Sequence, residues 1–454
     1  MLLCIAMITA LCGMSAFAED AAYVAEVDGT PYTSLSDAFD AVSKGGTVKL
    51  LDNVTASAQI AIGSDLFGKT ITLDLNEHNI IFDCAYGFTM NNYGAFTVTG
   101  KGTITNQTGV VFDVGGGSIT EGSMILNINK DVTIVSNDIC IYADEEGVDT
   151  KINVSGTLIA QGSRAAIQGN GTNFRRWHEI VVYDGANISA KTTAIYHPQK
   201  GSLKILGGTI TGNGCSAIEM RKGTLNISGN PIITSNADEY TVTANGSGAT
   251  TNGAAVAVAP YSDSAIVVDI SGGTFTGKKA LSYANPNPAT NFTATINVTG
   301  GKFNTDITEA LTNAEVKSNI SEYAVAANED GTYGIEKRNE AFEKVAAVHK
   351  AGDKTLTFLA GINNLDYTKA GFRVTLNGQE QEIPTSTVYT ALAVNGETVN
   401  STEKFGTKYF FAANIVINDD NIAEFTIKPF ATLINGDEVS AKEPTKVTLT
   451  GGAE

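Results

Sequence analysis

The chain has 454 residues, which is enough for two or three folding units rather than one globule. Its 48 acidic residues against 30 basic ones leave a formal charge of −18, which disfavours nucleic acid and anionic lipid as partners. Glycine is abundant (47), proline is scarce (9), and Thr, Val and Ile flanked by Asn and Gly predominate. We therefore expect an all-β protein with many tight corners and little helix.

The N-terminus begins with an apolar run that ends in Ala16-Phe17-Ala18, a small-x-small cleavage pattern. We predict a signal peptide at residues 1–18 and export to the cell surface or the medium. A membrane anchor is the alternative, but the run is barely long enough to span a bilayer and no stop-transfer charges follow it. After cleavage we expect no membrane span.

Residues 19–45 are predicted to hold a strand and a short capping helix. Ser34 and Asp37 have the spacing of a helix capping box. Apolar residues then recur at helical spacing: Leu35, Ala38, Phe39 and Val42. We expect this helix to close the open end of a repeat structure, whose first repeat would otherwise expose apolar side chains.

Residues 46–303 repeat one pattern: an alternating strand, a corner, a second short strand and a third strand signal. The corner positions are Gly100, Lys130, Gly156, Gly185, Gly207, Gly229, Gly272 and Gly300, at spacings of 22 to 43 residues. Three short strands per repeat predict a right-handed parallel β-helix, with paired glycines supplying positive φ at the corners. An antiparallel sandwich is the alternative, but it gives no reason for the corner to recur.

The chain after the repeats changes character twice. Residues 304–337 contain SEYAVAANEDGTYGIEK, which alternates around a polar turn and predicts a closing hairpin. Residues 338–454 contain longer alternating strands that end in Asn-Gly or other polar turns. They predict a C-terminal antiparallel β-sandwich.

Two segments, GGTVKLLDNVT and GKTITLDLNEHNIIF, together span residues 45–82. They resemble the entry and first coil of pectate-lyase-like β-helix proteins of bacterial surfaces, as do the later GGTF and GGKF corners. The similarity covers about residues 22–336 and implies a scaffold rather than an activity. Residues 365–436 are similar to appended β modules of large secreted bacterial proteins, whose role is spacing or attachment.

Two short motifs have an ordinary structural interpretation. GSDLFGKT, residues 63–70, matches the P-loop expression, but residues 70–75 alternate as a strand where a phosphate-binding helix would have to begin. Four Asn-x-Ser/Thr triplets lie within predicted strands, where asparagine is expected to face outward and stack in ladders rather than carry glycans. These triplets begin at Asn153, Asn187, Asn226 and Asn297.

The turn after the third strand carries most of the candidate binding residues. In successive coils it reads YADEE, FRRWH, YHPQK and EMRK, which stacking should align into one basic and aromatic stripe. Aromatic rings beside Arg and His suit sugars and acidic glycans. The alternative is a solvent face with Trp177 tucked against the coil. The candidate ligand-binding residues are Arg175, Arg176, Trp177, His178, Tyr196, His197 and Arg221.

The sequence contains no complete catalytic set, so we predict no catalytic residue, metal or cofactor. Cys84, Cys140 and Cys215 lack the spacing of a disulfide framework or a metal site, and we expect buried thiols. The favoured function is an exported, non-enzymatic, adhesin-like monomer that binds a glycan or cell-surface polymer. The alternative is a polysaccharide lyase or glycoside hydrolase of acidic polysaccharide, using the acidic turn 144–146 beside Arg175 and Arg176.

Overall fold

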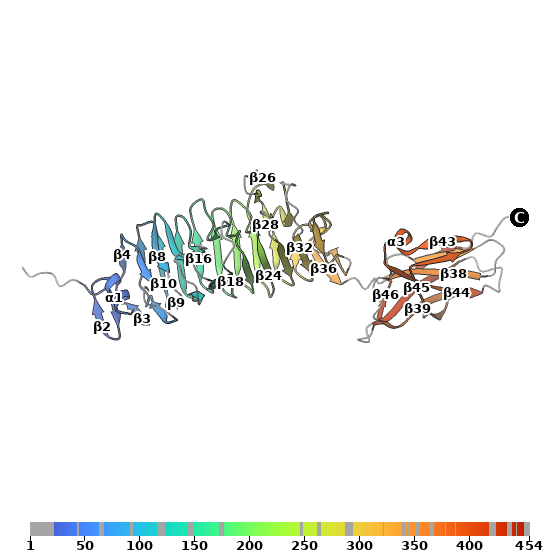
Figure 1. Cartoon of the computed structure of the whole chain (residues 1–454), viewed down its shortest axis with the longest axis horizontal. Coiled ribbons are helices and arrows are strands. Elements are labelled where there is room, and N and C mark those ends of the chain that lie inside the picture. The colour runs from blue at the N-terminus through green and yellow to red at the C-terminus, as the bar shows by residue number, and fades with distance from the viewer. Residues whose placement is uncertain are drawn as a thin grey trace, which may run out of the picture. The chain divides into compact units, whose positions relative to one another are not determined.

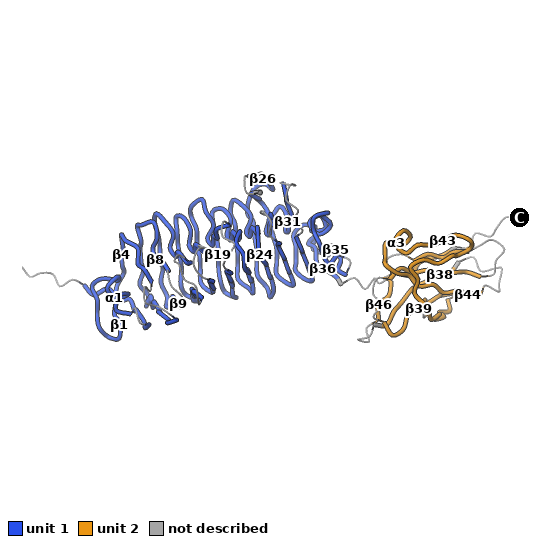
Figure 2. The backbone as a smooth tube through the Cα atoms, in the orientation of Figure 1, with its two compact units in different colours: residues 1–336 blue, residues 337–454 orange. Residues whose placement is uncertain are grey.

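The computed structural model divides the chain into two compact units, residues 1–336 and 337–454 (Figure 1, Figure 2). The predicted signal peptide, 1–18, lies outside the described residues. The structure describes residues 22–42, 45–62, 68–90, 94–115, 123–143, 149–171, 177–245, 248–260, 265–286, 294–320, 322–337, 342, 345–349, 355–362, 367–376, 378–385, 387–416, 424–433, 438–441 and 443–448.

Unit 1 is a parallel β-helix, as predicted, in which each full coil contributes one strand to each of three sheets. Sheet A runs β2 (Thr30–Tyr32), β1 (Ala25–Val27), β3 (Gly46–Leu50), β6 (Thr70–Asp74), β9 (Gly94–Thr99), β12 (Ser123–Ile128), β15 (Asp149–Val154), β18 (His178–Val182), β21 (Gly201–Ile205), β24 (Gly223–Ile227), β29 (Ile266–Ile270), β32 (Ala294–Val298) and β34 (Val316–Ser318).

The other two sheets follow the same order along the coils. Sheet B runs β4 (Val54–Ala56), β7 (Ile80–Phe82), β10 (Gly102–Asn106), β13 (Val132–Ser136), β16 (Thr157–Ala160), β19 (Asn187–Ala190), β22 (Thr209–Gly212), β25 (Ile232–Ser235), β30 (Thr274–Thr276), β33 (Lys302–Phe303), β36 (Tyr333–Lys337) and β35 (Tyr323–Ala327). Sheet C runs β5 (Ile60–Ile62), β8 (Tyr86–Met90), β11 (Val110–Val114), β14 (Ile141–Ala143), β17 (Ile167–Gly169), β20 (Ile195–His197), β23 (Ile218–Met220), β28 (Ala254–Val258) and β31 (Lys279–Tyr283).

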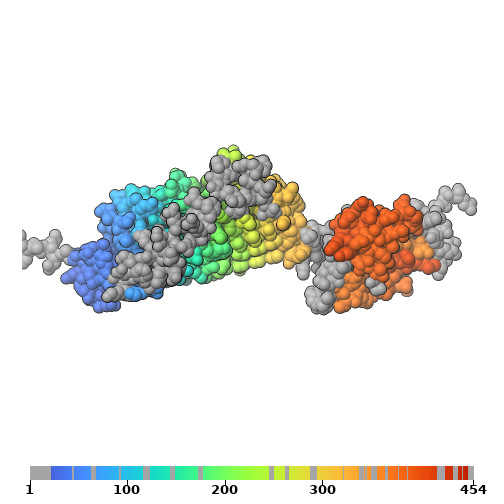
Figure 3. Space-filling view, in the orientation of Figure 1, coloured from blue at the N-terminus to red at the C-terminus, as the bar shows by residue number. Residues whose placement is uncertain are grey.

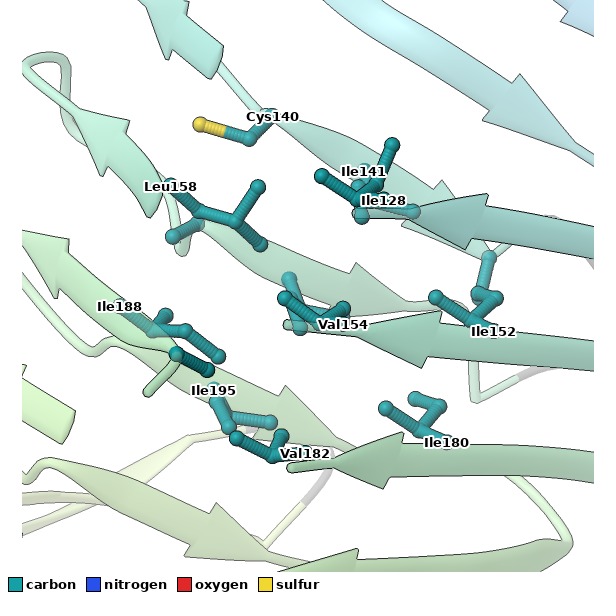
Figure 4. Packing of buried hydrophobic residues seen from close by; sticks show 14 of the residues in the cluster. Ile128, Cys140, Ile141, Ile152, Val154, Leu158, Ile180, Val182, Ile188 and Ile195 are labelled. Atoms are coloured by element: carbon teal, nitrogen blue, oxygen red, sulfur yellow. The ribbon is translucent and has the colours of Figure 1, made fainter. Parts of the chain in front are cut away.

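The core forms because equivalent apolar residues stack in register from coil to coil. In sheet B, Leu158 pairs with Ile188 and Ile188 with Ile210, and each of these side chains is fully buried. Figure 4 shows Leu158, Ile188 and Ile195 within this packing. A coil cannot enclose such residues alone, so burial accrues only when neighbouring coils stack.

The paired corner glycines serve two different physical needs. A Cβ on Gly272, the first of its pair, would lie 2.4 Å from the Gly229 carbonyl oxygen of the neighbouring coil. The second glycine supplies the left-handed backbone, with φ of 101° at Gly273 and 113° at Gly301. Positive φ was predicted for the corner, and close approach of the coils is an additional requirement.

Both ends of the β-helix are closed, as predicted. Helix α1 (Leu35–Ala41) begins at Ser34, whose hydroxyl accepts the Asp37 N–H, and it buries Phe39 against Phe88 with ring centroids 5.6 Å apart. At the other end β35 and β36 form the closing hairpin, and Tyr333 of β36 pairs antiparallel with β33. Helix α2 (Thr308–Leu311), which the sequence analysis did not predict, lies between β33 and β34.

Unit 2 is the predicted antiparallel β-sandwich. Phe358 of β38 (Thr355–Ile362) and Phe372 of β39 (Tyr367–Leu376) meet between its two larger sheets, with ring centroids 5.7 Å apart. One sheet has the strand order β37 (Val345–His349), β38 (Thr355–Ile362), β44 (Tyr409–Val416) and β41 (Val388–Tyr389). The other has the order β40 (Gln379–Thr385), β39 (Tyr367–Leu376), β45 (Glu424–Leu433) and β46 (Glu438–Ser440), and β47 (Thr445–Thr448) also pairs with β45. A small hairpin, β42 (Ala391–Val394) and β43 (Glu397–Asn400), precedes α3 (Ser401–Lys404).

The structure also supports the structural interpretation of the short motifs. The P-loop match runs into strand β6 rather than a helix, while residues 63–67 lie outside the described part. Asn153 donates its side-chain N–H to Asn127 at 2.8 Å and Asn297 to Asp269 at 2.9 Å, which confirms outward polar ladders for these two. None of the helices in the described residues has the length and hydropathy that a bilayer span requires.

Candidate functional site

The predicted stripe is only partly exposed. Trp177 is 47% exposed, and its backbone N–H donates to Asp149 Oδ1 at 2.9 Å. His178, His197 and Arg221 are buried, at 1%, 0% and 2% exposure, so the expectation of an exposed basic row is wrong for these three. Arg175, Arg176 and the acidic turn at residues 144–146 lie outside the described residues.

The two histidines belong to the interior of the β-helix. In β20 the side chains alternate, so His197 points inward like Ile195, two residues earlier. Its Nδ1 donates to the Lys222 carbonyl oxygen at 3.1 Å, and burial lowers the pKa of His197 to about 4. His178 starts β18, where its Nδ1 lies 2.5 Å from Thr150 Oγ1.

A second row lies on the outer face of sheet C. Register pairs Tyr142 with Gln168, Gln168 with Tyr196, and Tyr196 with Glu219. Tyr196 is half-buried, and its hydroxyl accepts a hydrogen bond from Arg221 Nη1 at 3.2 Å. Arg221 therefore holds the tyrosine ring from the neighbouring coil instead of facing solvent.

An inserted hairpin covers this row at Glu219, which is 2% exposed. The hairpin consists of β26 (Thr241–Asn245) and β27 (Gly248–Asn252) and stands out from the stacked coils (Figure 1, Figure 3). Ser216 Oγ donates to the Thr251 carbonyl oxygen at 2.6 Å. Burial raises the pKa of Glu219 to about 7, while the Arg221 charge and the Thr251 N–H oppose that rise.

A cleft of about 550 Å³ lies beside the same hairpin. Segments far apart in the sequence meet there: the residues before and within β26, the end of β31, and the turn before β34. The lining residues are Tyr240, Val242, Tyr283, Ala284, Asn285, Pro286, Asn313, Ala314 and Glu315.

Glu315 organises the polar side of this cleft. The Tyr283 hydroxyl donates to Glu315 Oε2 at 2.9 Å, and Asn285 Nδ2 donates to the same oxygen at 3.1 Å. Burial, together with this hydrogen bond and the charge of Glu315, raises the pKa of Tyr283 above its usual range. Tyr283 therefore remains a neutral hydroxyl with a half-buried ring at the cleft.

A smaller cavity of about 30 Å³ adjoins the cleft and shares Tyr240, Tyr283 and Asn313 with it. Lys279, on its wall, lies with its Nζ 5.9 Å from the centroid of the Tyr240 ring. The same ammonium forms an ion pair with Glu309 at 2.5 Å. Aromatic rings with a few fixed polar groups can orient a polar ligand that also has an apolar face.

Among the described residues, no group of three or more His, Cys, Asp or Glu side chains is placed to hold a metal ion. Cys84, Cys140 and Cys215, the cysteines among the described residues, are free thiols; Cys140 is buried as predicted, whereas Cys84 and Cys215 are half-buried.

The sequence alone does not reveal this cleft, although the length of one repeat interval indicates the inserted hairpin. The interval of 43 residues between Gly229 and Gly272 exceeds every other repeat interval and contains the insertion. Comparison with protein-family models, with curated proteins and with solved structures found no match to this chain.

Proposed function

We propose that this chain is an exported, adhesin-like β-helical scaffold of the pectate-lyase-like type, and that it binds a glycan without turning it over. The observation that carries the proposal is the cleft beside the inserted hairpin. Its Tyr240 and Tyr283 offer half-buried rings, and Asn285, Asn313 and Glu315 offer polar groups beside them. This combination suits sugar rings, which have both apolar faces and hydroxyl edges.

The dimensions of the cleft also suit a sugar ligand. About 550 Å³ falls within the usual range for small-molecule sites, and the cleft is shallow enough to receive part of a longer chain. The cleft is built partly on strand β31, which is firmly packed, because its buried Leu281 pairs with the buried Val256 of β28 in the neighbouring coil. Sites built on such elements hold their geometry better than sites on loops alone.

Trp177 offers a second, separate contact surface. Among the candidate ligand-binding residues that the structure describes, Trp177 is the exposed one, at 47%, and a stacked sugar ring would cover its apolar face. The formal charge of −18 also suits an exported protein, because net charge keeps a protein soluble.

An acidic-polysaccharide lyase or hydrolase is the alternative function. The observation that favours it is Glu219, whose pKa is raised to about 7 beside Arg221, since a proton donor or acceptor near neutral pH suits such chemistry. Its 2% exposure beneath the hairpin keeps a polymer away from the carboxyl group, so we favour binding.

The test combines a glycan array with calorimetry on the full chain. Tyr240→Ala and Tyr283→Ala should each weaken binding by about tenfold or more, because each removes an aromatic contact. Tyr86→Ala is the control, since Tyr86 is an exposed tyrosine of sheet C that lies far from the cleft, at the opposite end of the β-helix. Trp177→Ala tests the second surface separately.

Two results would contradict the proposal. Unchanged affinity in both cleft variants would remove the cleft from the binding function. Release of reducing or unsaturated ends from a bound polysaccharide, abolished by Glu219→Gln, would replace the binding function with catalysis.

A further inference from the structure

We propose that the Tyr240–Tyr283 cleft selects glycans by charge, favouring chains with protonated amino sugars over neutral chains and disfavouring uronic-acid chains. This inference rests on the proposed glycan-binding function and adds the chemical class of the ligand. It reverses the earlier expectation of an acidic glycan, which depended on basic residues of the stripe.

Most of the charged residues that line the cleft and the adjoining cavity are acidic. Glu315 lines the cleft, and Asp306 and Glu309 line the adjoining cavity. Lys279 is the basic residue of these two linings, and its ammonium is already engaged by Glu309 at 2.5 Å. A ligand carboxylate would therefore meet excess negative charge, whereas a ligand ammonium would meet a carboxylate.

The sequence next to the cleft-lining residues is mainly acidic, although Lys278 precedes Lys279 and Lys317 lies two residues after Glu315. Asp238 and Glu239 directly precede Tyr240. The local balance agrees with the formal charge of −18 for the whole chain.

The fixed hydrogen bonds of Glu315 make it suitable for recognising an ammonium group. Tyr283 and Asn285 both donate to Oε2, which orients the carboxylate and holds it in place. A charged acceptor fixed by two donors loses little freedom when a ligand ammonium binds, and charge-assisted hydrogen bonds are about twice as strong as neutral ones. For one partly exposed pair we expect roughly a tenfold gain in affinity at low salt.

The experiment uses three hexasaccharide probes and the full chain: glucosamine oligomer, N-acetylglucosamine oligomer and galacturonate oligomer. Calorimetry at about pH 5.5 and low salt should give affinities in that order, with roughly tenfold steps. Raising the salt concentration to a physiological level should reduce the affinity for the glucosamine oligomer and leave the neutral oligomer nearly unchanged, because salt screens exposed charges.

Glu315→Gln isolates the charge. The glutamine oxygen can still accept from Tyr283 and Asn285, so the shape of the cleft is retained. The variant should lose the tenfold preference for the glucosamine oligomer while binding the neutral oligomer as before. Asp184→Asn, which removes an exposed acid at a distant corner of the coils, is the control and should change neither affinity.

The outcomes separate the two proposals. Equal affinity for all three probes, or tightest binding of the galacturonate oligomer, would overturn charge selection and leave glycan binding intact. Binding of none of the three probes would overturn charge selection, whereas the glycan array with the Tyr240→Ala and Tyr283→Ala variants decides glycan binding separately. A preference for the glucosamine oligomer that survives Glu315→Gln would also overturn the inference, because the charge would then lie elsewhere.

Discussion

Two buried ionisable residues on neighbouring coils should give the β-helix opposing responses to pH. Glu219 and His197 are 2% and 0% exposed, and burial is the main cause of both pKa shifts. The perturbations are Glu219→Gln, which keeps an acceptor for the Thr251 N–H, and His197→Asn, which keeps a donor for the Lys222 carbonyl oxygen. Each replaces an ionisable group by a neutral one of similar polarity.

The Glu219 contribution falls as pH rises. Its pKa is about 7 in the folded protein against an ordinary 4.5, so between these values the folded state holds a proton that the unfolded chain has lost. Raising the pH therefore favours unfolding across this window. A difference of one pH unit in pKa between the folded and unfolded states corresponds to about 1.4 kcal/mol. The free energy of unfolding should therefore fall by about 3 kcal/mol between pH 4.5 and 7.

The His197 contribution has the opposite sign. Its pKa is about 4 in the folded protein against an ordinary 6.5, so between these values the unfolded chain binds a proton that the folded state excludes. Raising the pH then favours the folded state, by about 3 kcal/mol between pH 4 and 6.5. The two contributions cancel over the shared window from about pH 4.5 to 6.5.

Denaturant unfolding of the wild type and both variants, measured at several pH values, checks this cancellation. Relative to the wild type, the stability of Glu219→Gln should rise with pH and that of His197→Asn should fall, each by about 3 kcal/mol. The ionisable groups of unit 2 are the same in all three proteins, so unit 2 does not contribute to the difference in unfolding free energy between variant and wild type. Parallel pH profiles for the wild type and Glu219→Gln would refute the assignment of a raised pKa to a buried Glu219.

Two further predictions concern the packing of unit 1. Gly272→Ala should lower the free energy of unfolding of the β-helix by about 1–3 kcal/mol, because the added Cβ would lie 2.4 Å from the Gly229 carbonyl oxygen. Gly→Ala at an uncrowded site usually does not destabilise a protein. An unchanged denaturant midpoint would therefore show that the neighbouring coils can move apart to accept the methyl group. Cys140 should resist alkylation in the native protein at about pH 8, because burial raises the pKa of its thiol to about 12. Mass spectrometry after iodoacetamide treatment should find the half-buried Cys84 modified first, and rapid native labelling of Cys140 would contradict its burial.

The expected and observed positions of the stripe residues differ for a simple physical reason. In a strand, successive side chains point to opposite faces, so a shift of one residue moves a side chain from solvent to core. His197 lies two residues after the buried Ile195 and shares its inward direction. The sequence pattern predicts a turn at these residues, whereas strand β20 continues through His197.

The sequence by itself determined the β-helix, its caps and the sandwich, because those features depend on local alternation, corner glycines and repetition. Leu158 and Ile188 were predictable core residues, since each occupies the same place in its own coil. The cleft depended on tertiary structure alone. Tyr240, Tyr283 and Glu315 lie in three separate segments, and only the coiling of the chain and the folding of the inserted hairpin bring these residues together.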